Sequence, residues 1–164
     1  MGNKISEIVN DCYVNFEDVQ RCIRNRNTQF IILNTMPPNM QSCLISCTIN
    51  ANDEESIINQ LLSSNKNSWF PSSQNNSIDN VTIIIYGKNN NEQNVFNKYN
   101  QLQTLGFTNV YIYPGGMFEW LLLQDIYGET EFPTTSRELD ILRYKPISSI
   151  IRKIGNNKNL LMAP

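Results

Sequence analysis

Two short apolar runs limit the folds open to this sequence more than any other feature. Phe30–Leu33 and Val81–Tyr86 are almost free of polar positions, which is typical of strands buried on both faces of a parallel sheet. Apolar residues at helical spacing occupy 53–63 and 92–105. The order strand, helix, strand, helix predicts an α/β domain with a mainly parallel central sheet and helices on both faces.

Caps and turns add further elements to this pattern. Asn15 is a suitable N-cap for a helix, and Gly106 is a natural end for the helix over 92–105. In the loop that follows the helix over 53–63, we expect Trp69 and Phe70 to contact the core. The other predicted elements are a helix over 16–25, a short strand or extended connection over 43–49, a Ser- and Asn-rich loop over 63–80, a strand over 109–113 and, after the turn Pro114–Gly116, a helix from Met117 to Gln124.

The length and charge of the chain restrict both its organisation and its chemistry. The 164 residues, 40% of them hydrophobic, suit one domain, which we place at 14–132, between an N-terminal segment (1–13) and a C-terminal extension (133–164). The net charge of -2 argues against nucleic-acid binding. The absence of histidine excludes His-dependent catalysis and His-ligated zinc.

The cysteines indicate a reducing compartment and no metal site. Cys12, Cys22, Cys43 and Cys47 form no Cys-x-x-Cys pair and fit no familiar zinc spacing. The sequence has no apolar run of about 18 residues and no secretory signal. We therefore expect a cytoplasmic protein with reduced thiols, without a metal or another cofactor.

The first residues suggest a lipid anchor. Met1-Gly2-Asn3-Lys4-Ile5-Ser6 matches the pattern for N-myristoylation, in which Gly2 becomes the acylated amine. One myristoyl chain binds membranes only marginally, so a second signal is needed. An alternative is a terminus that starts Met-Gly without modification.

The C-terminal extension is a candidate for that second signal. Residues 137–164 hold six basic and two acidic residues, a net charge of +4. Their apolar residues fall on one helical stripe, namely Ile147, Ile150, Ile151 and Ile154. The stripe suits either a membrane surface or docking onto the apolar surface of the domain itself.

The predicted topology also locates a binding site. Ligands of parallel α/β sheets lie at the carboxyl ends of the strands, where backbone amides at helix N-termini favour anions. This reasoning points to the loop Gly87–Glu92, with the turn Pro114–Gly116 and the residues after Leu33 beside it.

The segment 81–120 resembles the second half of a rhodanese-like domain. The resemblance is carried, in order, by Tyr86, Leu102, Gly106-Phe107, Val110-Tyr111, Gly115-Gly116 and Trp120. A looser resemblance covers 14–50, where Phe16–Val19 matches the opening helix and Phe30–Met36 matches a strand that carries an Asp and an Arg in the family. Family membership implies a single α/β domain whose sulfur-transferring cysteine follows the Tyr.

The departures from that family bear directly on function. Gly87 stands at the position of the cysteine, and Glu92 or Gln93 stands near the arginine that often closes the loop. Asn34 and Met36 replace the Asp and the Arg, and the segment 42–48 lacks the family's histidine and glycine. Because glycine cannot carry sulfur, transfer by the usual route is excluded, and so is the phosphocysteine chemistry of the related phosphatases.

Three functions are therefore considered. The first is a non-catalytic binding or scaffolding protein, tethered to a membrane through Gly2, that recognises a protein or small anion with Gly87, Lys88, Asn89, Asn90, Asn91 and Glu92, completed by Asn34, Thr35 and Met36. The second is a sulfurtransferase or persulfide carrier with a relocated nucleophile, Cys43 or Cys47. The third is a structural component of a virion or membrane coat. The 25 asparagines and 20 isoleucines, which use AT-rich codons, suggest an AT-rich genome, such as that of a protist or a large DNA virus.

Overall fold

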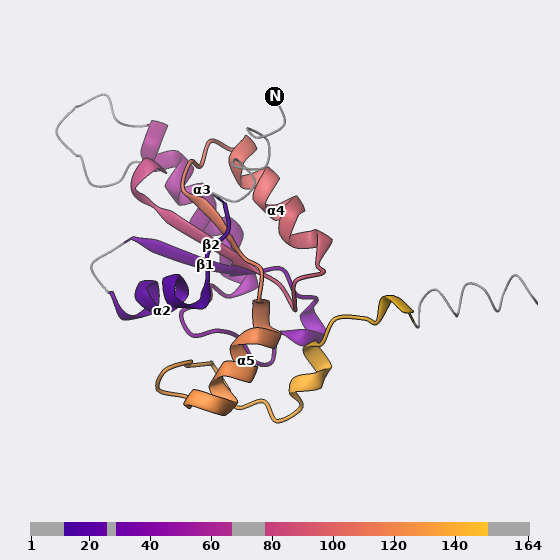
Figure 1. Ribbon diagram of the computed structural model, residues 1–164. Coiled ribbons are helices and arrows are strands. Elements are labelled where there is room, and N and C mark those ends of the chain that lie inside the picture. Colours follow the sequence, from indigo (N-terminus) through magenta and orange to yellow (C-terminus); the bar gives the residue numbers. More distant parts are fainter. Residues whose placement is uncertain (1–11, 26–28, 67–77, 151–164) are drawn as a thin grey trace, which may run out of the picture.

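A three-stranded parallel sheet forms the centre of the protein in a computed structural model that describes residues 12–25, 29–66 and 78–150. The strands are β1 (Phe30–Asn34), β2 (Thr82–Tyr86) and β3 (Val110–Tyr113), in the spatial order β1-β2-β3 (Figure 1). In the register, Asn34 lies beside Tyr86, and Tyr86 lies beside Tyr113. The predicted strands and their parallel arrangement are confirmed, and the carboxyl ends of all three strands meet at one edge.

Both outer strands are covered by other parts of the chain. Tyr13 forms a parallel bridge with Ile112 of β3, and Thr48 forms one with Ile32 of β1. The segment 43–49 is neither the strand nor the extended connection that was expected. It turns at residues 46–47, where Cys47 has φ of +68° and Thr48 N donates to Ile45 O at 3.1 Å. These bridges satisfy strand-edge groups that would otherwise be open to pairing with another chain.

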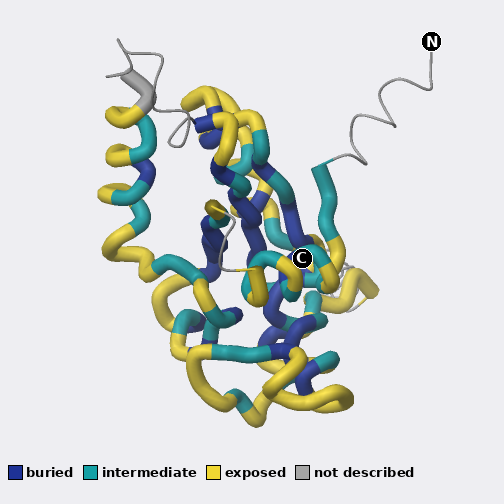
Figure 2. Tube along the Cα trace, turned by 90° about the vertical axis from the view of Figure 1, so that its left-hand side faces the viewer, coloured by how far each residue is buried: buried dark blue, intermediate teal, exposed yellow. Residues whose placement is uncertain are grey.

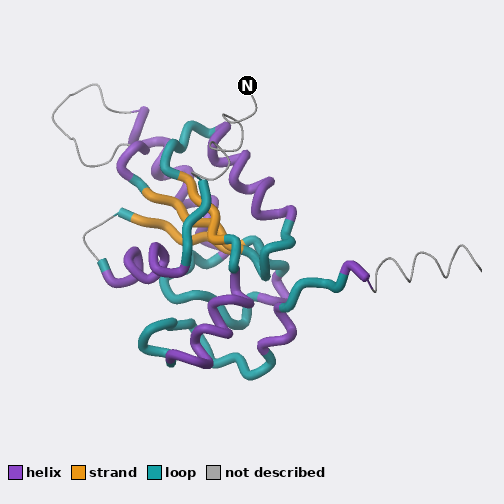
Figure 3. The backbone as a smooth tube through the Cα atoms, in the orientation of Figure 1, coloured by secondary structure: helices purple, strands orange, loops and turns teal. Residues whose placement is uncertain are grey.

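Among the described residues, four α-helices and three short 3₁₀-helices surround the sheet, and Figure 3 shows their arrangement around the strands. They are α2 (Phe16–Arg24), η1 (Pro38–Met40), α3 (Ala51–Lys66), η2 (Ile78–Asn80), α4 (Gln93–Thr104), α5 (Gly116–Tyr127) and η3 (Ile141–Tyr144). The N-cap of α2 is Asn15, as predicted, and a reciprocal pair of hydrogen bonds with Asp18 completes a capping box. Gly106 follows α4 with φ of +101°, which explains the end of that helix at a glycine.

The sheet separates two hydrophobic cores, one on each face. Figure 2 shows that the buried positions gather in the interior, whereas the outer turns and loops are exposed. One core joins the sheet to α2, α5 and η3 and contains the fully buried Trp120 and Tyr144. The other joins the sheet to α3 and α4 through residues such as Ile58, Val95 and Leu102. The predicted α/β architecture with helices on both faces is therefore correct.

The apolar stripe predicted for α4 is correct only in part. Val95 and Leu102 are buried and Tyr99 packs against them, but Phe96 is 38% exposed. The face of α4 that meets the sheet is narrow and follows the 95, 99, 102 spacing, so Phe96 falls outside it.

The C-terminal segment leaves the domain after η3. Up to residue 150 it runs outward in Figure 1, and Ile147 and Ile150 are 72% and 71% exposed. This part of the stripe is therefore not docked onto the domain. Gly2, Trp69, Phe70, Ile151 and Ile154 lie outside the described residues. Within 12–25, 29–66 and 78–150, no helix is both long and apolar enough to cross a membrane.

Candidate functional site

The predicted site lies at the carboxyl edge of the sheet, and its neighbouring segments come together as expected. The first amides of α5 donate to the loop after β2: Met117 N to Gly87 O and Phe118 N to Lys88 O, both at 3.0 Å. Thr35 N donates to Tyr86 O at 3.0 Å. The loop Gly87–Glu92 is thus held between the end of β1 and the start of α5.

Gly87 is buried, and a side chain at this position would crowd Val95 and Glu92. A Cβ atom at this position would lie 2.9 Å from Cγ2 of Val95 and 3.1 Å from both Cβ and Cγ of Glu92. Real Cβ contacts are rarely this close. The side chains of Val95 and Glu92 therefore occupy the space into which a side chain at position 87 would extend.

The three asparagines of the loop have different roles. Asn89 is 8% exposed; its Nδ2 donates to Tyr144 O at 2.9 Å, and its Oδ1 accepts from Asn91 N at 3.0 Å. The side chains of Asn90 and Asn91 are exposed. Asn89 is thus structural, whereas Asn90 and Asn91 face solvent.

The charged groups of the loop are Lys88 and Glu92, both half-buried. Within the described part of the chain Lys88 makes no ion pair. Glu92 is the N-cap of α4 without a side-chain capping hydrogen bond. The Cβ and Cγ atoms of Glu92 lie close to Gly87, and its carboxylate would repel an anion bound at the N-terminus of α4.

The end of β1 does not complete an open rim as expected. Asn34 and Met36 are only 6% and 3% exposed, and Thr35 is half-buried. The Asn34 Oδ1 accepts from Met36 N at 3.2 Å, so this side chain stabilises its own turn. Met36 belongs to the core that α5 covers.

Tyr86 fixes the 43–49 connection against the end of β2. Its hydroxyl accepts from Ile45 N at 3.2 Å and pairs with Thr48 Oγ1 at 2.9 Å. Tyr86 is fully buried, and this burial raises the pKa of its hydroxyl. The hydroxyl therefore stays protonated and acts as a structural group.

Tyr113 has a different polar environment. Its hydroxyl is buried without a hydrogen-bond partner in the part of the chain that the structure describes. Burial raises the pKa of Tyr113, and the nearby Glu119 carboxylate adds to the shift. That carboxylate lies over Gly115 at the start of α5.

The two candidate replacement nucleophiles lie in contrasting environments. Cys43 is 1% exposed and its Sγ donates to Ser136 O at 3.2 Å; burial raises the pKa of this thiol above its usual value. A thiol with a raised pKa is a poor nucleophile at neutral pH. Cys47 is exposed and adopts a left-handed conformation with φ of +68°. No group of three or more potential metal ligands occurs among the described residues.

The C-terminal extension crosses this edge, which the sequence pattern does not predict. Tyr144 is fully buried in the core, and its carbonyl accepts the Asn89 hydrogen bond. Arg143 Nη2 donates to Asn39 O of η1 at 2.6 Å. The one available signal was Tyr144 itself, because periodicity does not distinguish it from the neighbouring Leu139 and Leu142 as a core residue.

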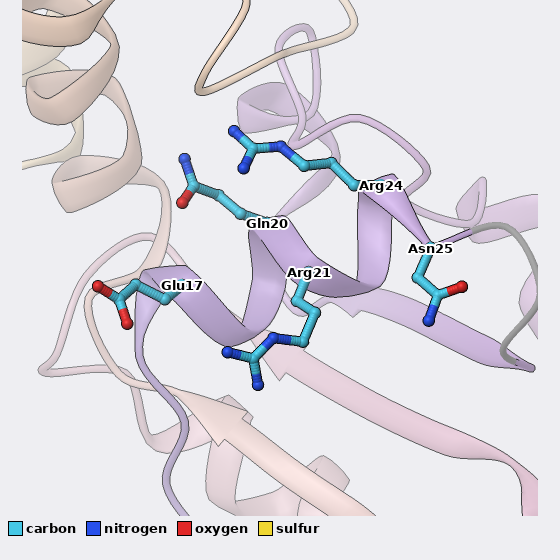
Figure 4. Close-up of a pocket in the computed structure, with 5 residues that line it drawn as sticks. All are labelled: Glu17, Gln20, Arg21, Arg24 and Asn25. Carbon is cyan, nitrogen blue, oxygen red and sulfur yellow. The ribbon is translucent and has the colours of Figure 1, made fainter.

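A hollow lies on α2, away from the predicted site. It is lined by Glu17, Gln20, Arg21, Arg24 and Asn25, whose side chains point in different directions (Figure 4). Arg24 pairs with Glu131, and Gln20 Nε2 donates to Glu131 O at 2.7 Å. These contacts join α2 to the loop after α5, and the two arginines do not converge on a common point.

Alkaline pH is expected to destabilise the protein through its buried tyrosines. Burial, followed by the charge of Glu138, raises the pKa of Tyr144 to about 12. The unfolded chain loses this proton near pH 10, so the stabilisation is complete below about pH 10 and declines as the pH rises towards 12. Urea unfolding at pH 9 and pH 11 measures this loss, and Tyr144→Phe should lose less stability over this range than the wild type. An equal loss in both proteins would contradict the assignment.

Comparisons with known proteins agree with this architecture. The family model described as Rhodanese-like domain matches residues 26–123. No curated protein matches significantly. Among solved structures, a full-length Lactobacillus plantarum protein aligns over 84% of this chain and 100% of its own, with 17% identity and a TM-score of 0.55. The Rhodanese-like domain of an Anabaena protein, solved by NMR, covers 84% of this chain and 86% of its own, with 17% identity and a TM-score of 0.47.

The family match spans more than half of the chain and includes the three strands and the loop Gly87–Glu92. Its last matched residue, 123, lies within α5, so the segment that crosses the carboxyl edge falls outside it. The sequence resemblance and the parallel sheet lead to the same assignment. The chain belongs to the rhodanese-like domain family.

Proposed function

We propose that this protein is a non-catalytic rhodanese-like module that binds a partner protein at the edge of the degenerate loop. The observation that carries the proposal is Gly87, where the family's reactive thiol is absent and the space for it is filled by Val95 and Glu92. Sulfur transfer needs a thiolate at this point, and neither a glycine nor its neighbours supply one.

The binding surface consists of Lys88, Asn90 and Asn91, here called the rim. Asn90 and Asn91 are exposed, and Lys88 has no ionic partner among the described residues. Asparagine side chains both donate and accept hydrogen bonds without charge, which suits recognition of a polar protein surface. A protein partner is favoured over a small anion because Glu92 places a carboxylate beside the helix end that an anion would use.

A comparison of two matched variants tests this role. In the first, Lys88, Asn90 and Asn91 are replaced by alanine; in the second, the exposed Asn97, Asn100 and Gln101 of α4 are replaced instead. Crosslinking in cells followed by mass spectrometry should detect a partner that the first variant loses and the second retains. If the rim variant keeps every partner that the wild type binds, the proposal is wrong.

The second part of the proposal is membrane attachment through Gly2. The motif at residues 1–6 supports it, and the basic extension supplies the additional signal that one acyl chain requires. Co-expression with N-myristoyltransferase should add one myristoyl mass to the wild type and none to Gly2→Ala. An unmodified wild type under these conditions would refute the attachment.

A further inference from the structure

The segment after α5 has two parts that differ in how firmly they are held. Residues 132–136, here called the anchor, bond closely to the domain: Gln124 Nε2 donates to Phe132 O at 2.7 Å, and Thr135 N donates to Leu44 O at 2.8 Å. Further anchor contacts are Ser46 N to Pro133 O, Leu44 N to Thr135 Oγ1, Ser136 Oγ to Ser42 O, Trp120 Nε1 to Pro133 O and Cys43 Sγ to Ser136 O.

Residues 137–145, here called the arm, are held by far fewer contacts. Tyr144 is the one buried residue of the arm, and Ile141 packs against the same core, whereas Leu139 and Leu142 are 79% and 64% exposed. Outside its own residues the arm bonds to the domain through Arg143, which donates to Asn39 O, and through the Tyr144 carbonyl. A segment with few buried contacts next to a densely bonded one is expected to open locally before the domain unfolds.

One residue, Asn89, contacts both the arm and the loop that carries the rim. Its Nδ2 bonds to Tyr144 O of the arm, and its Oδ1 receives the amide of Asn91 in the loop. Both bonds use the same buried carboxamide, so Asn89 connects the arm to the loop directly.

We propose that the arm can detach from the domain and that its detachment controls the conformation of the rim. The buried Tyr144 side chain holds the arm in place, and Asn89 links the arm to the loop. While Tyr144 is buried, the loop is rigid, and Lys88, Asn90 and Asn91 are held in one arrangement. With Tyr144 withdrawn, Asn89 loses its partner and the rim becomes mobile. This inference names a form of regulation of the proposed binding site and therefore rests on the proposed function.

Hydrogen exchange monitored by mass spectrometry tests the coupling between the arm and the loop in the full-length protein. Tyr144→Ala should increase exchange about tenfold in both the arm and the 87–92 loop, while β2 stays as protected as in the wild type. Leu142→Ala is the matched control, because it truncates an exposed arm residue and should change neither segment.

Two results would overturn the inference. One is faster exchange in the arm with an unchanged loop, which would show that the two are not linked. The other is faster exchange throughout the sheet, which would make Tyr144 an ordinary core residue. If Tyr144→Ala does not fold, Asn89→Ala serves instead, because it removes the link while leaving the tyrosine ring in the core; its arm should then exchange faster than that of the wild type, and an unchanged arm would overturn the link.

The outcome is separable from that of the proposed function. Hydrogen exchange reports on the coupling between arm and loop whether or not a partner exists, whereas the rim variants report on partner binding alone. Coupled exchange without partner loss would support control of the loop by the arm and would reject the binding role. Partner loss without coupled exchange would do the reverse.

Discussion

Gly116→Ala is expected to destabilise the domain by about 3 kcal/mol or more, because it combines backbone strain with a collision. Gly116 has φ of +63°, a region that residues with a side chain avoid. Its Cβ would lie 2.6 Å from Gly87 O and 3.0 Å from Asn89 N, which are backbone atoms of the loop. Relief of the contact would separate α5 from the loop and weaken the bond from Met117 N to Gly87 O.

Gly128→Ala supplies the control for this prediction. Gly128 has φ of +96°, but its Cβ would have no atom within 4 Å. It should therefore show backbone strain without a collision, about 1–3 kcal/mol, because φ of +96° with ψ of 164° is a conformation that is almost confined to glycine. Denaturant unfolding of both variants tests whether the collision at Gly116 adds to the cost of strain. Equal destabilisation would mean that α5 does not pack against the loop as closely as described.

Gly87→Cys is expected to restore no sulfur transfer and to destabilise the protein by about 1–3 kcal/mol, the usual cost of overpacking. The new side chain would meet Cγ2 of Val95 at 2.9 Å and the stem of Glu92 at 3.1 Å. The carboxylate of Glu92 would also raise the pKa of the introduced thiol, where a nucleophile needs a lowered value. Urea unfolding and a thiosulfate-dependent sulfur-transfer assay measure the two effects.

The double variant Gly87→Cys with Val95→Ala separates steric from chemical causes. Removing the valine methyl groups should recover part of the lost stability, because it opens the space that the cysteine needs. Activity should remain at the background level, since Glu92 is still present. Full activity of Gly87→Cys would show that the missing thiol is the one difference between this site and an active site of the family.

Much of the fold could be predicted from the sequence because local and tertiary preferences agree in this chain. The runs around Ile32 and Ile84 are apolar on both faces and became the central strands, and the Asn15 cap and Gly106 end depend on contacts within a few residues. Phe96 was misplaced because a stripe drawn on a helix does not show how wide the face against the sheet is.

The site was less predictable, because its decisive contacts join residues far apart in the chain. The spacing of the family motif identified Gly87, but not that Val95 fills the space beside it. Nothing local distinguishes Asn89 from the asparagines after it, and its role depends on the carbonyl of Tyr144, 55 residues further on. Asn34 and Met36 were assigned to a rim although both are buried, since strand-end position alone does not report exposure.

Persulfide mapping tests the non-catalytic assignment most directly. The reduced protein is incubated with thiosulfate or mercaptopyruvate, and each of its four cysteines is examined by mass spectrometry. We expect no cysteine to gain sulfur selectively, because Gly87 carries no thiol and the thiol of Cys43 is buried with a raised pKa. Selective sulfur gain at Cys43 or Cys47 would show that the nucleophile has moved and that the protein is an enzyme.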